Sequence, residues 1–384
     1  MWRGADIWLP AYLRHPKRSG FESPTDVMIA VCDHFEPFHH TDKDHALRRV
    51  RDWQNRFPEI CKRFRDHDGQ APRHTFFYPI EQYDEAIVQG LAEICQTTGS
   101  EVEIHLHHDN DTEDGLREAI RAGIHHFANH QLLSQDEHQI PSYAFIHGNW
   151  ALDHSDPEGR HCGVRRELQL LKETGCYGDF TMPSAPHPTQ TQTVNQIYYG
   201  VETESAKSHN TGYRVTAPRP NASSTLKEIH STRALRNRSD HLLLVQGPLG
   251  LNWKRRKWGI LPRLENADLT GKNPPTPDRL HIWLRNAIHV QNRPEWLFVK
   301  LHCHGAINPN RNMLLGDPMQ AFHQHLADLA RVGSPLRFHY VSAREMVNII
   351  HAAEDGKTGD PNAFRNYLIK SNIPFKDGTQ VPSS

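Results

Sequence analysis

Short apolar segments alternate with amphipathic segments of helical periodicity along most of the chain. Residues 26–32 (DVMIAVC) are almost continuously apolar, which is typical of a strand buried on both faces. Strands are predicted at 26–32, 74–78, 101–107, 143–147, 178–182, 241–246, 296–302 and 336–340. Helices are predicted at 45–65, 84–97, 112–130, 163–174, 278–290, 318–332 and 343–353.

This order of elements predicts the architecture. Repeated alternation of strand and helix favours an α/β fold, a parallel (β/α) barrel of seven or eight strands that is distorted or partly open. An open doubly wound sheet is the alternative. Residues 183–238 are rich in Pro, Ser, Thr and Asn, so we expect long insertions after strands. The sequence contains no long linker or internal repeat, which predicts one catalytic domain over 1–384 with a C-terminal helical tail at about 342–384.

The composition excludes several classes of protein. Lys plus Arg (44) nearly equals Asp plus Glu (45), so no overall field directs the chain towards nucleic acid or a membrane. No run approaches the about 18 consecutive apolar residues of a membrane span, and residues 1–20 lack the apolar core of a signal peptide. The six cysteines have no paired spacing. We therefore expect a cytoplasmic protein with reduced cysteines; the sequence predicts no particular oligomeric state.

The 29 histidines matter most where strands end. In a parallel barrel the catalytic residues come from the C-terminal ends of different strands. Four such ends carry histidine: Asp33, His34 and Glu36; His105, His107, His108, Asp109 and Asp111; His147, Asn149 and Trp150; and His302 and His304. Imidazole and carboxylate groups are the ligands that suit Zn²⁺ and related divalent metals. The pattern therefore predicts a divalent metal site at these strand ends, with Zn²⁺ as the favoured ion.

Residue alternation on the third predicted strand supports a site at this end. Glu101, Glu103, His105 and His107 share one face of that strand. Buried polar side chains need partners, which a metal at the strand end and a hydrogen-bond network beneath it would supply. Alternation also turns Cys303 away from its two flanking histidines, which argues against a catalytic thiol.

Other patterns allow more than one interpretation. The chain has no GxGxxG or GxxxxGK[ST] motif and hence no sequence signal for a dinucleotide or nucleoside triphosphate. Residues 253–263 (WKRRKWGILPR) mix aromatic and basic side chains, which predicts either contact with an anionic sugar or a solvated basic loop. Asn149, Trp150, Tyr198 and Tyr199 suit the walls of a sugar site, and Trp and Tyr are equally typical of a core.

Three of these motifs resemble those of the polysaccharide deacetylase family of carbohydrate esterases, within the glycoside hydrolase/deacetylase barrel superfamily. Residues 29–34 (IAVCDH) resemble its first motif, a strand ending in two aspartates, with Asp33 at the position of the catalytic base. His34 then replaces the metal-binding aspartate. Residues 103–111 (EIHLHHDND) resemble its histidine-rich motif, which implies that His107 and Asp111 are the other ligands. The resemblance extends over about residues 24–345.

The last motif of the family is an apolar strand ending in the histidine that protonates the leaving group, and residues 298–302 resemble it. Either His302 or His304 takes that role. The arginine of the family's third motif has no counterpart at 145–150, and Arg160 is expected to substitute. The residues expected to contact substrate are Glu36, His105, Asp109, His147, Asn149, Trp150 and Arg160.

The resemblance implies metal-assisted hydrolysis of an N-acetyl group on a sugar, in polysaccharide or glycoconjugate metabolism. Two alternatives stay open. Glycoside hydrolysis on the same barrel needs two flanking carboxylates, for which Asp33 with Glu36 or Asp109 would serve. A non-catalytic sugar- or metal-binding barrel is the other alternative, because the motifs depart from the family pattern.

Overall fold

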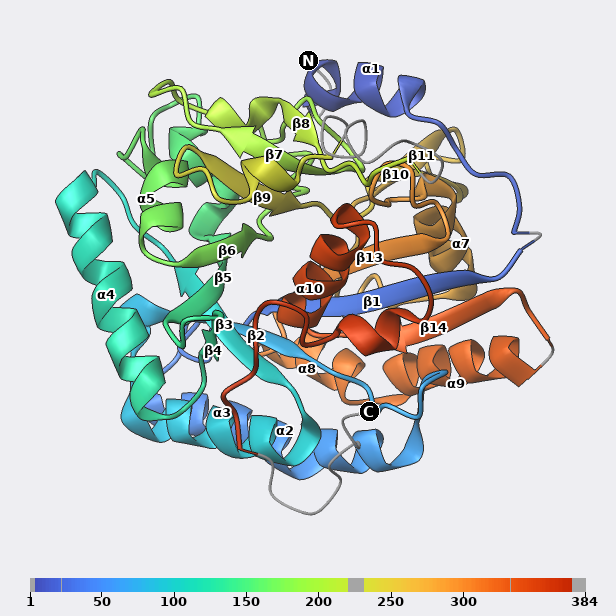
Figure 1. Ribbon diagram of the computed structural model, residues 1–384. Coiled ribbons are helices and arrows are strands. Elements are labelled where there is room, and N and C mark those ends of the chain that lie inside the picture. Colours follow the sequence, from blue (N-terminus) through green and yellow to red (C-terminus); the bar gives the residue numbers. More distant parts are fainter. Residues whose placement is uncertain (1–3, 22, 220–230, 332, 375–384) are drawn as a thin grey trace.

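A computed structural model describes residues 4–21, 23–219, 231–331 and 333–374, which form a mixed α/β fold (Figure 1). The strands are β1 (Thr25–His34), β2 (Thr75–Pro79), β3 (Glu101–Leu106), β4 (Ser134–Gln135), β5 (Pro141–His147), β6 (Cys176–Asp179), β7 (Ile197–Val201), β8 (Gly212–Arg214), β9 (His241–Val245), β10 (Gly250–Lys257), β11 (Leu261–Glu265), β12 (Asp268–Leu269), β13 (Trp296–Cys303) and β14 (Leu336–Tyr340). The helices are α1 (Ala5–Arg14), α2 (Lys43–Arg63), α3 (Glu85–Thr98), α4 (Glu113–Asn129), α5 (Glu167–Glu173), α7 (Pro277–Asn286), α8 (Asn308–Leu314), α9 (Asp317–Arg331) and α10 (Ala343–Glu354).

The central sheet is mostly parallel, as the sequence predicts. Its strands follow the order β12-β13-β1-β2-β3-β5-β6-β9-β7-β8, and β7 pairs antiparallel with both β8 and β9. Strand β1 contacts β13 along most of its length, whereas β14 pairs with its first half and β2 with its last residues. Among the described strands, no pairing joins the two ends of this order. Closure into a barrel therefore stays a prediction.

The two faces of each central strand pack against different layers. On β1, Val27, Ile29 and Val31 belong to a core cluster shared with α2, α3, α4 and α9. The alternate residues Met28 and Ala30 belong to a second cluster, shared with α10. In Figure 1 helices α2, α3, α4, α5 and α9 lie around the periphery of the view, and α10 lies at its centre. We call the face towards the surrounding helices the outer face and the face towards α10 the inner face.

Helix α10 is the most buried helix of the fold. All of its residues from Ala343 to Glu354 are buried, and it begins with a capping box between Ser342 and Glu345. The expected C-terminal tail thus starts with a helix inside the core, followed by a segment whose Arg365 and Ile369 carbonyls accept hydrogen bonds from it. Lys370 then pairs with Gln135 of β4. Residues 375–384 lie outside the described part of the chain.

Residues 253–263 lie in the hairpin β10–β11, which differs from the expected loop, whereas contact with an anionic sugar stays a prediction. These residues form most of an antiparallel pair rather than a loop, and the pair stands apart from the central sheet. Alternation is weak there because exposed residues occur on both faces, so periodicity did not reveal the strands. In the described residues no helix is long and apolar enough to cross a membrane. All six cysteines are free and buried.

Candidate metal site

Residue alternation on β1 separates two neighbouring polar residues. The outer row of Val27, Ile29 and Val31 continues to Asp33, whereas the inner row continues to His34. The same alternation on β13 places His302 on the inner face and Cys303 on the outer face, beside Asp33. The expectation that Cys303 faces away from its flanking histidines is confirmed.

Five histidines and one glutamate come together where β1, β3 and β13 end, and the exposed His39 also lies 3.3 Å from Glu36 Oε2. The set, which we call the Glu36 cluster, consists of His34, Glu36, His105, His107, His302 and His304. The ring centre of His34 lies 4.7 Å from that of His304, 5.0 Å from His105 and 6.1 Å from His302. Glu36 Oε1 lies 3.3 Å from His105 Nε2 and 3.4 Å from His107 Nε2. Three separate strand ends therefore converge, and they are three of the four that the sequence predicts.

The hydrogen bonds of this cluster leave ligand atoms with lone pairs free to bind a cation. His105 Nδ1 lies 2.7 Å from the carbonyl oxygen of Ile146, so Nδ1 carries the hydrogen. In the neutral ring Nε2 then presents a lone pair to the Glu36 carboxylate, with no hydrogen between them. The Nε2 of His34 is buried and has no hydrogen-bond partner. His34, Glu36 and His105 each offer a ligand atom, all within 4.8 Å of one another, so the residues present fit a divalent metal.

The environment keeps opposite charges on Glu36 and His107. Burial by itself would raise the pKa of Glu36, but the adjoining His105 and His107 side chains hold that pKa well below its ordinary value. Burial would lower the pKa of His107, but hydrogen bonds to Glu36 and Glu81 raise it to about 9. His107 Nδ1 lies 2.8 Å from Glu81 Oε1. His107 thus joins the two carboxylates as a cation.

The other histidines of the cluster favour the neutral form. Burial, and next the neighbouring His304, lowers the pKa of His34 well below its ordinary value. Burial, followed by Lys300, does the same to the pKa of His302. Burial also lowers the pKa of His304. Neutral imidazole is the form that binds a metal.

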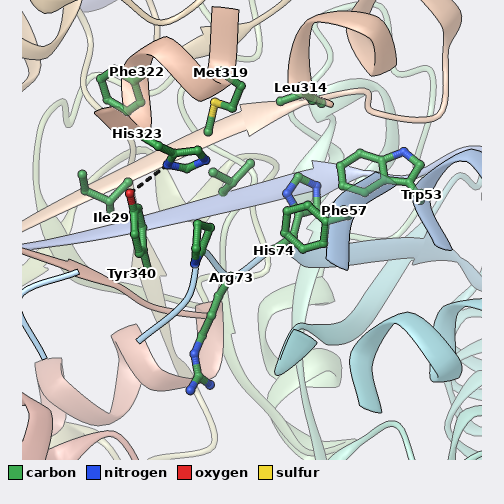
Figure 2. A pocket seen from close by; sticks show the side chains of 12 residues that line it. Ile29, Trp53, Phe57, Arg73, His74, Leu314, Met319, Phe322, His323 and Tyr340 are labelled. Carbon is green, nitrogen blue, oxygen red and sulfur yellow. Dashed lines mark hydrogen bonds between the residues drawn. The ribbon is translucent and has the colours of Figure 1, made fainter. Parts of the chain in front are cut away.

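Asp33 lies on the side of β1 opposite to the Glu36 cluster. It is fully buried, accepts a hydrogen bond from the Gly305 N–H at 2.6 Å, and lies 2.8 Å from His74 Nε2. A side chain at Gly305 would collide with the Asp33 carboxylate, so glycine permits this close approach. His74 in turn lines a small cavity with Trp53 and Phe57 (Figure 2). With a volume of about 20 Å³ the cavity has room for about one water molecule, and hence not for a sugar.

His147 belongs to a second buried group on the outer side of β5, and Asp111 pairs with one member of that group. His108 Nε2 lies 2.8 Å from His147 Nε2 and 3.2 Å from Glu167 Oε1, and His147 Nε2 lies 3.4 Å from the same oxygen. Asp111 Oδ2 lies 2.9 Å from His108 Nδ1. We call His108, His147 and Glu167 the Glu167 group. The structure therefore places Asp111 beside His108, and does not bring it together with His34 and His107.

The remaining predicted substrate residues make other contacts. Asp109 accepts a hydrogen bond from His161 N at 2.6 Å. Arg160 is half exposed and pairs with Glu158 at 3.0 Å. Asn149 and Trp150 lie in a tight turn with φ values of 54° and 56°. Within the described part of the chain, no hydrogen bond or ion pair joins any of these four to the Glu36 cluster.

Three residues of these sites escaped the sequence analysis. Glu81 is the second residue after β2, so the strand-end pattern that found the histidines also applies to it. Glu167 opens α5 and His74 precedes β2, and neither position carries a signal in the sequence. The hydrogen-bond network expected beneath the third strand is present: Glu103 accepts from Ala144 N at 2.6 Å, and Glu101 accepts from Arg344. Burial raises the pKa of Glu103 to about 8.

Comparison with known proteins identifies no family for this chain. No family model matches it, and no curated protein matches it. Among solved structures it is similar to a crystal structure described as a "putative polysaccharide deacetylase from Mycobacterium smegmatis". The TM-score is 0.42 and the sequence identity 11%, over 90% of this chain and 96% of that chain. The similarity is distant and concerns the fold, so any assignment of function must rest on the site itself.

Proposed function

We propose that this protein is a metal-dependent hydrolase that removes an N-acetyl group from a sugar in a polysaccharide or glycoconjugate. The observation that carries the proposal is the Glu36 cluster, in which the His105 Nε2 lone pair faces the Glu36 carboxylate at 3.3 Å. Two acceptor atoms at that distance repel unless a proton or a metal ion lies between them, and the buried, unpartnered Nε2 of His34 beside them favours the metal ion. The resemblance of the strand-end motifs to polysaccharide deacetylases supplies the substrate class.

His34, Glu36 and His105 would hold the ion, because each offers a buried ligand atom within 4.8 Å of the others. This set replaces His107 and Asp111 of the sequence prediction, since His107 is engaged by two glutamates and Asp111 by His108. A bound divalent ion supplies a Lewis acid for the amide carbonyl and lowers the pKa of a bound water. Zn²⁺ is the ion that two imidazoles and one carboxylate suit best.

The chain's own residues supply the proton transfer. A departing amine must receive a proton, and histidine is the usual donor. His304 lies nearer to His34 than His302 does, with ring centres at 4.7 Å against 6.1 Å, so His304 is assigned as the donor. His302 lies on the inner face of β13, farther from His34. The role of Asp33 as the base rests on the resemblance, and its place on the outer face makes that role the first to test.

Glycoside hydrolysis is less well supported. That reaction needs two carboxylates on either side of the scissile bond. Of the carboxylates that the sequence offers for this pair, Asp33 faces the helices and Asp109 accepts from His161 N. Glu36 and the nearby Glu81 are both held by His107. The ligand set favours metal-assisted chemistry instead.

The test measures metal content and acetate release together. His34→Ala and Glu36→Gln should each lose one equivalent of metal, because losing one of three ligands is rarely tolerated, and each should stop acetate release from an N-acetylglucosamine oligomer. His323→Gln is the matched control, because His323 is buried and bonds to Tyr340 rather than to either histidine group. It should keep both metal and activity. If both cluster variants retain the metal content of the wild type, the proposed site is wrong. If the wild type binds metal but releases no acetate, the alternative of a non-catalytic metal-binding barrel is favoured.

A further inference from the structure

The Glu167 group lies apart from the proposed active site. His108 follows β3, His147 ends β5, and Glu167 is the first residue of α5. His147 continues the outer row of β5 with Phe145, which belongs to the helix-side core, whereas His105 lies on the inner face of β3. His147 and Glu167 are fully buried, and the side chain of His108 is 6% exposed. Three ligand-type side chains therefore converge between a strand end and a helix.

The hydrogen bonds of both rings determine where their hydrogens lie. His108 Nδ1 is 2.9 Å from the Asp111 carboxylate, and His147 Nδ1 is 2.5 Å from the carbonyl oxygen of Gly148. Both partners are acceptors, so each Nδ1 carries a hydrogen. In the neutral rings both Nε2 atoms are then bare lone pairs, only 2.8 Å apart.

Glu167 adds a third acceptor to the same point. Its Oε1 lies 3.2 Å from His108 Nε2 and 3.4 Å from His147 Nε2. Its other oxygen accepts a hydrogen bond from Asp153 N at 2.5 Å, which fixes the carboxylate. Three electron-rich atoms without a hydrogen between them repel in a buried setting, so a cation must lie among them.

The geometry points to a second divalent metal ion, bound by His108 Nε2, His147 Nε2 and Glu167 Oε1. Two histidines and one glutamate form a known three-protein-ligand set for Zn²⁺. Ligand atoms at about 2.0–2.1 Å from a tetrahedral Zn²⁺ lie roughly 3.3–3.4 Å apart, so the pocket has to open by about half an ångström at one edge. The thiol of Cys162 lies within 4.8 Å of these atoms and favours a soft ion such as Zn²⁺ over Mg²⁺.

The partners behind the ligands are those of a metal site. Asp111 and the Gly148 carbonyl orient the two rings, as carboxylate and carbonyl groups do behind metal-binding histidines. Asp111 therefore acts through His108 in this site, whereas the sequence predicts that Asp111 is itself a metal ligand. The alternative occupant is a proton that makes His108 an imidazolium paired with Glu167. Whether the group takes up a metal ion distinguishes these two possible occupants.

The experiment titrates full-length protein, first stripped with a chelator, with Co²⁺ and with Zn²⁺. Visible absorption of Co²⁺ and elemental analysis are the readouts. The wild type should bind two equivalents, and Glu167→Gln and His147→Gln should each lose one. Asp111→Asn, which leaves all three ligands in place, should weaken one site by roughly 10–100-fold. His34→Ala is the matched control from the Glu36 cluster, and it should keep the Glu167 site.

Two outcomes would overturn the second site. One is that Glu167→Gln and Asp111→Asn bind as much metal as tightly as the wild type. The other is that the stripped wild type takes up no more ions than these variants do. A proton, and not a metal ion, then holds the group together. The result is independent of the proposed function: if His34→Ala keeps all its metal while Glu167→Gln loses one equivalent, the Glu36 site fails and the Glu167 site stands.

The β10–β11 hairpin has an exposed apolar surface. Four of the seven exposed large hydrophobic side chains of the described residues lie on it: Trp253, Trp258, Ile260 and Leu261. Trp258 and Ile260 at the turn are 76% and 74% exposed. The segment 250–264 contains no acidic residue and carries five cations: Lys254, Arg255, Arg256, Lys257 and Arg263. Lys254 pairs with Asp278 at 2.6 Å, so four cations with no acidic partner among the described residues flank the exposed apolar tip.

From this pairing we infer that the hairpin tip docks on an anionic membrane surface. Tryptophan is typical of the membrane–water interface, and each Lys or Arg near an anionic bilayer contributes about 1 kcal/mol. Lys257 lies with its Nζ 4.3 Å from the ring centre of Trp258, so cation and aromatic ring are presented together. Nucleic acid is the weaker partner, because the aliphatic tip formed by Ile260 and Leu261 gains nothing from phosphates. The net charge of −1 makes the attraction local to the hairpin.

Vesicle co-sedimentation tests this surface. Full-length protein should sediment with vesicles of phosphatidylcholine and phosphatidylglycerol in equal parts, and much less with phosphatidylcholine alone. The double variant Trp258→Ala, Ile260→Ser should bind at least ~10-fold more weakly, since the tip supplies the buried apolar area. Tyr213→Ala, an exposed aromatic residue on β8, is the control and should bind as the wild type does. Equal binding of the double variant, or binding to single-stranded RNA without binding to vesicles, would overturn the inference.

Discussion

Asp33 and His34 are neighbours in the chain, yet they lie on opposite faces of β1. The alternation that turns His34 towards His105 turns Asp33 towards His74 and the Gly305 N–H. The surroundings of Asp33 are those of a structural anchor, because its carboxylate ties β1 to β2 and to the turn after β13. The sequence motif alone does not distinguish this role from that of a catalytic base.

Replacing Asp33 with Asn should therefore reduce stability. The variant removes the charge that faces His74 within the core, so we expect the free energy of unfolding to fall by roughly 1–3 kcal/mol. Metal content should stay at the wild-type value, because His34, Glu36 and His105 are untouched. Urea denaturation and elemental analysis check both. Unchanged stability with complete loss of turnover would restore Asp33 as the base.

At the scale of elements, a buried charge network joins β14 to β1. His339 on β14 lies 2.8 Å from Asp26 on β1 and 2.7 Å from Asp68 in the segment before β2. Arg337 also pairs with Asp26, and Arg365 with Asp68. Burial by itself would lower the pKa of His339, but hydrogen bonds to Asp26 and Asp68 raise it to about 9. The protonated ring thus links three segments of the chain.

This network predicts a loss of stability at alkaline pH. Because the pKa of His339 is higher in the folded state than its value of about 6.5 in the unfolded state, its contribution is complete below about pH 6.5. The contribution is lost as the pH rises through about 9. The wild type should lose on the order of 1–3 kcal/mol relative to His339→Asn across this window. Urea unfolding of both proteins at several pH values measures it. Parallel pH profiles for the two proteins would contradict the assignment.

At the scale of the whole molecule, α10 connects the C-terminal segment to the sheet. Arg344 donates to Glu101 on β3 from Nε at 2.9 Å and from Nη2 at 2.7 Å. The same guanidinium donates to the carbonyl oxygens of Arg365 and Ile369. Arg344 and Glu101 are both buried. One side chain thus holds together the inner helix, a central strand and the last described segment.

Removing one member of this buried pair should be costly. Arg344→Leu leaves Glu101 buried without its cation, so we expect the free energy of unfolding to fall by roughly 3–5 kcal/mol. The double variant Arg344→Leu, Glu101→Leu should recover part of that loss, because no unpaired charge remains. Thermal and urea unfolding compare the three proteins. If the double variant is as unstable as the single one, the loss comes from the contacts to the C-terminal segment instead.

Much of the organisation followed from the sequence alone. The period of apolar residues located the central strands and most helices, because burial on two faces requires near-continuous apolar runs. Strand ends rich in histidine identified the members of the Glu36 cluster, and alternation placed Cys303 on the outer face. These are local properties, decided by the geometry of a strand within a few residues.

The packing of elements that are distant in the chain determines which of these residues share a site. His107 and His108 are adjacent in the chain, but His107 bonds to Glu36 and His108 to Glu167. Strand β3 ends at Leu106, so alternation no longer sets the direction of either side chain. Glu167 reaches His147 through the packing of α5 against the sheet, a contact that no local pattern encodes. The physical reason is that periodicity specifies which face a residue takes, whereas a ligand set depends on which elements are neighbours in space.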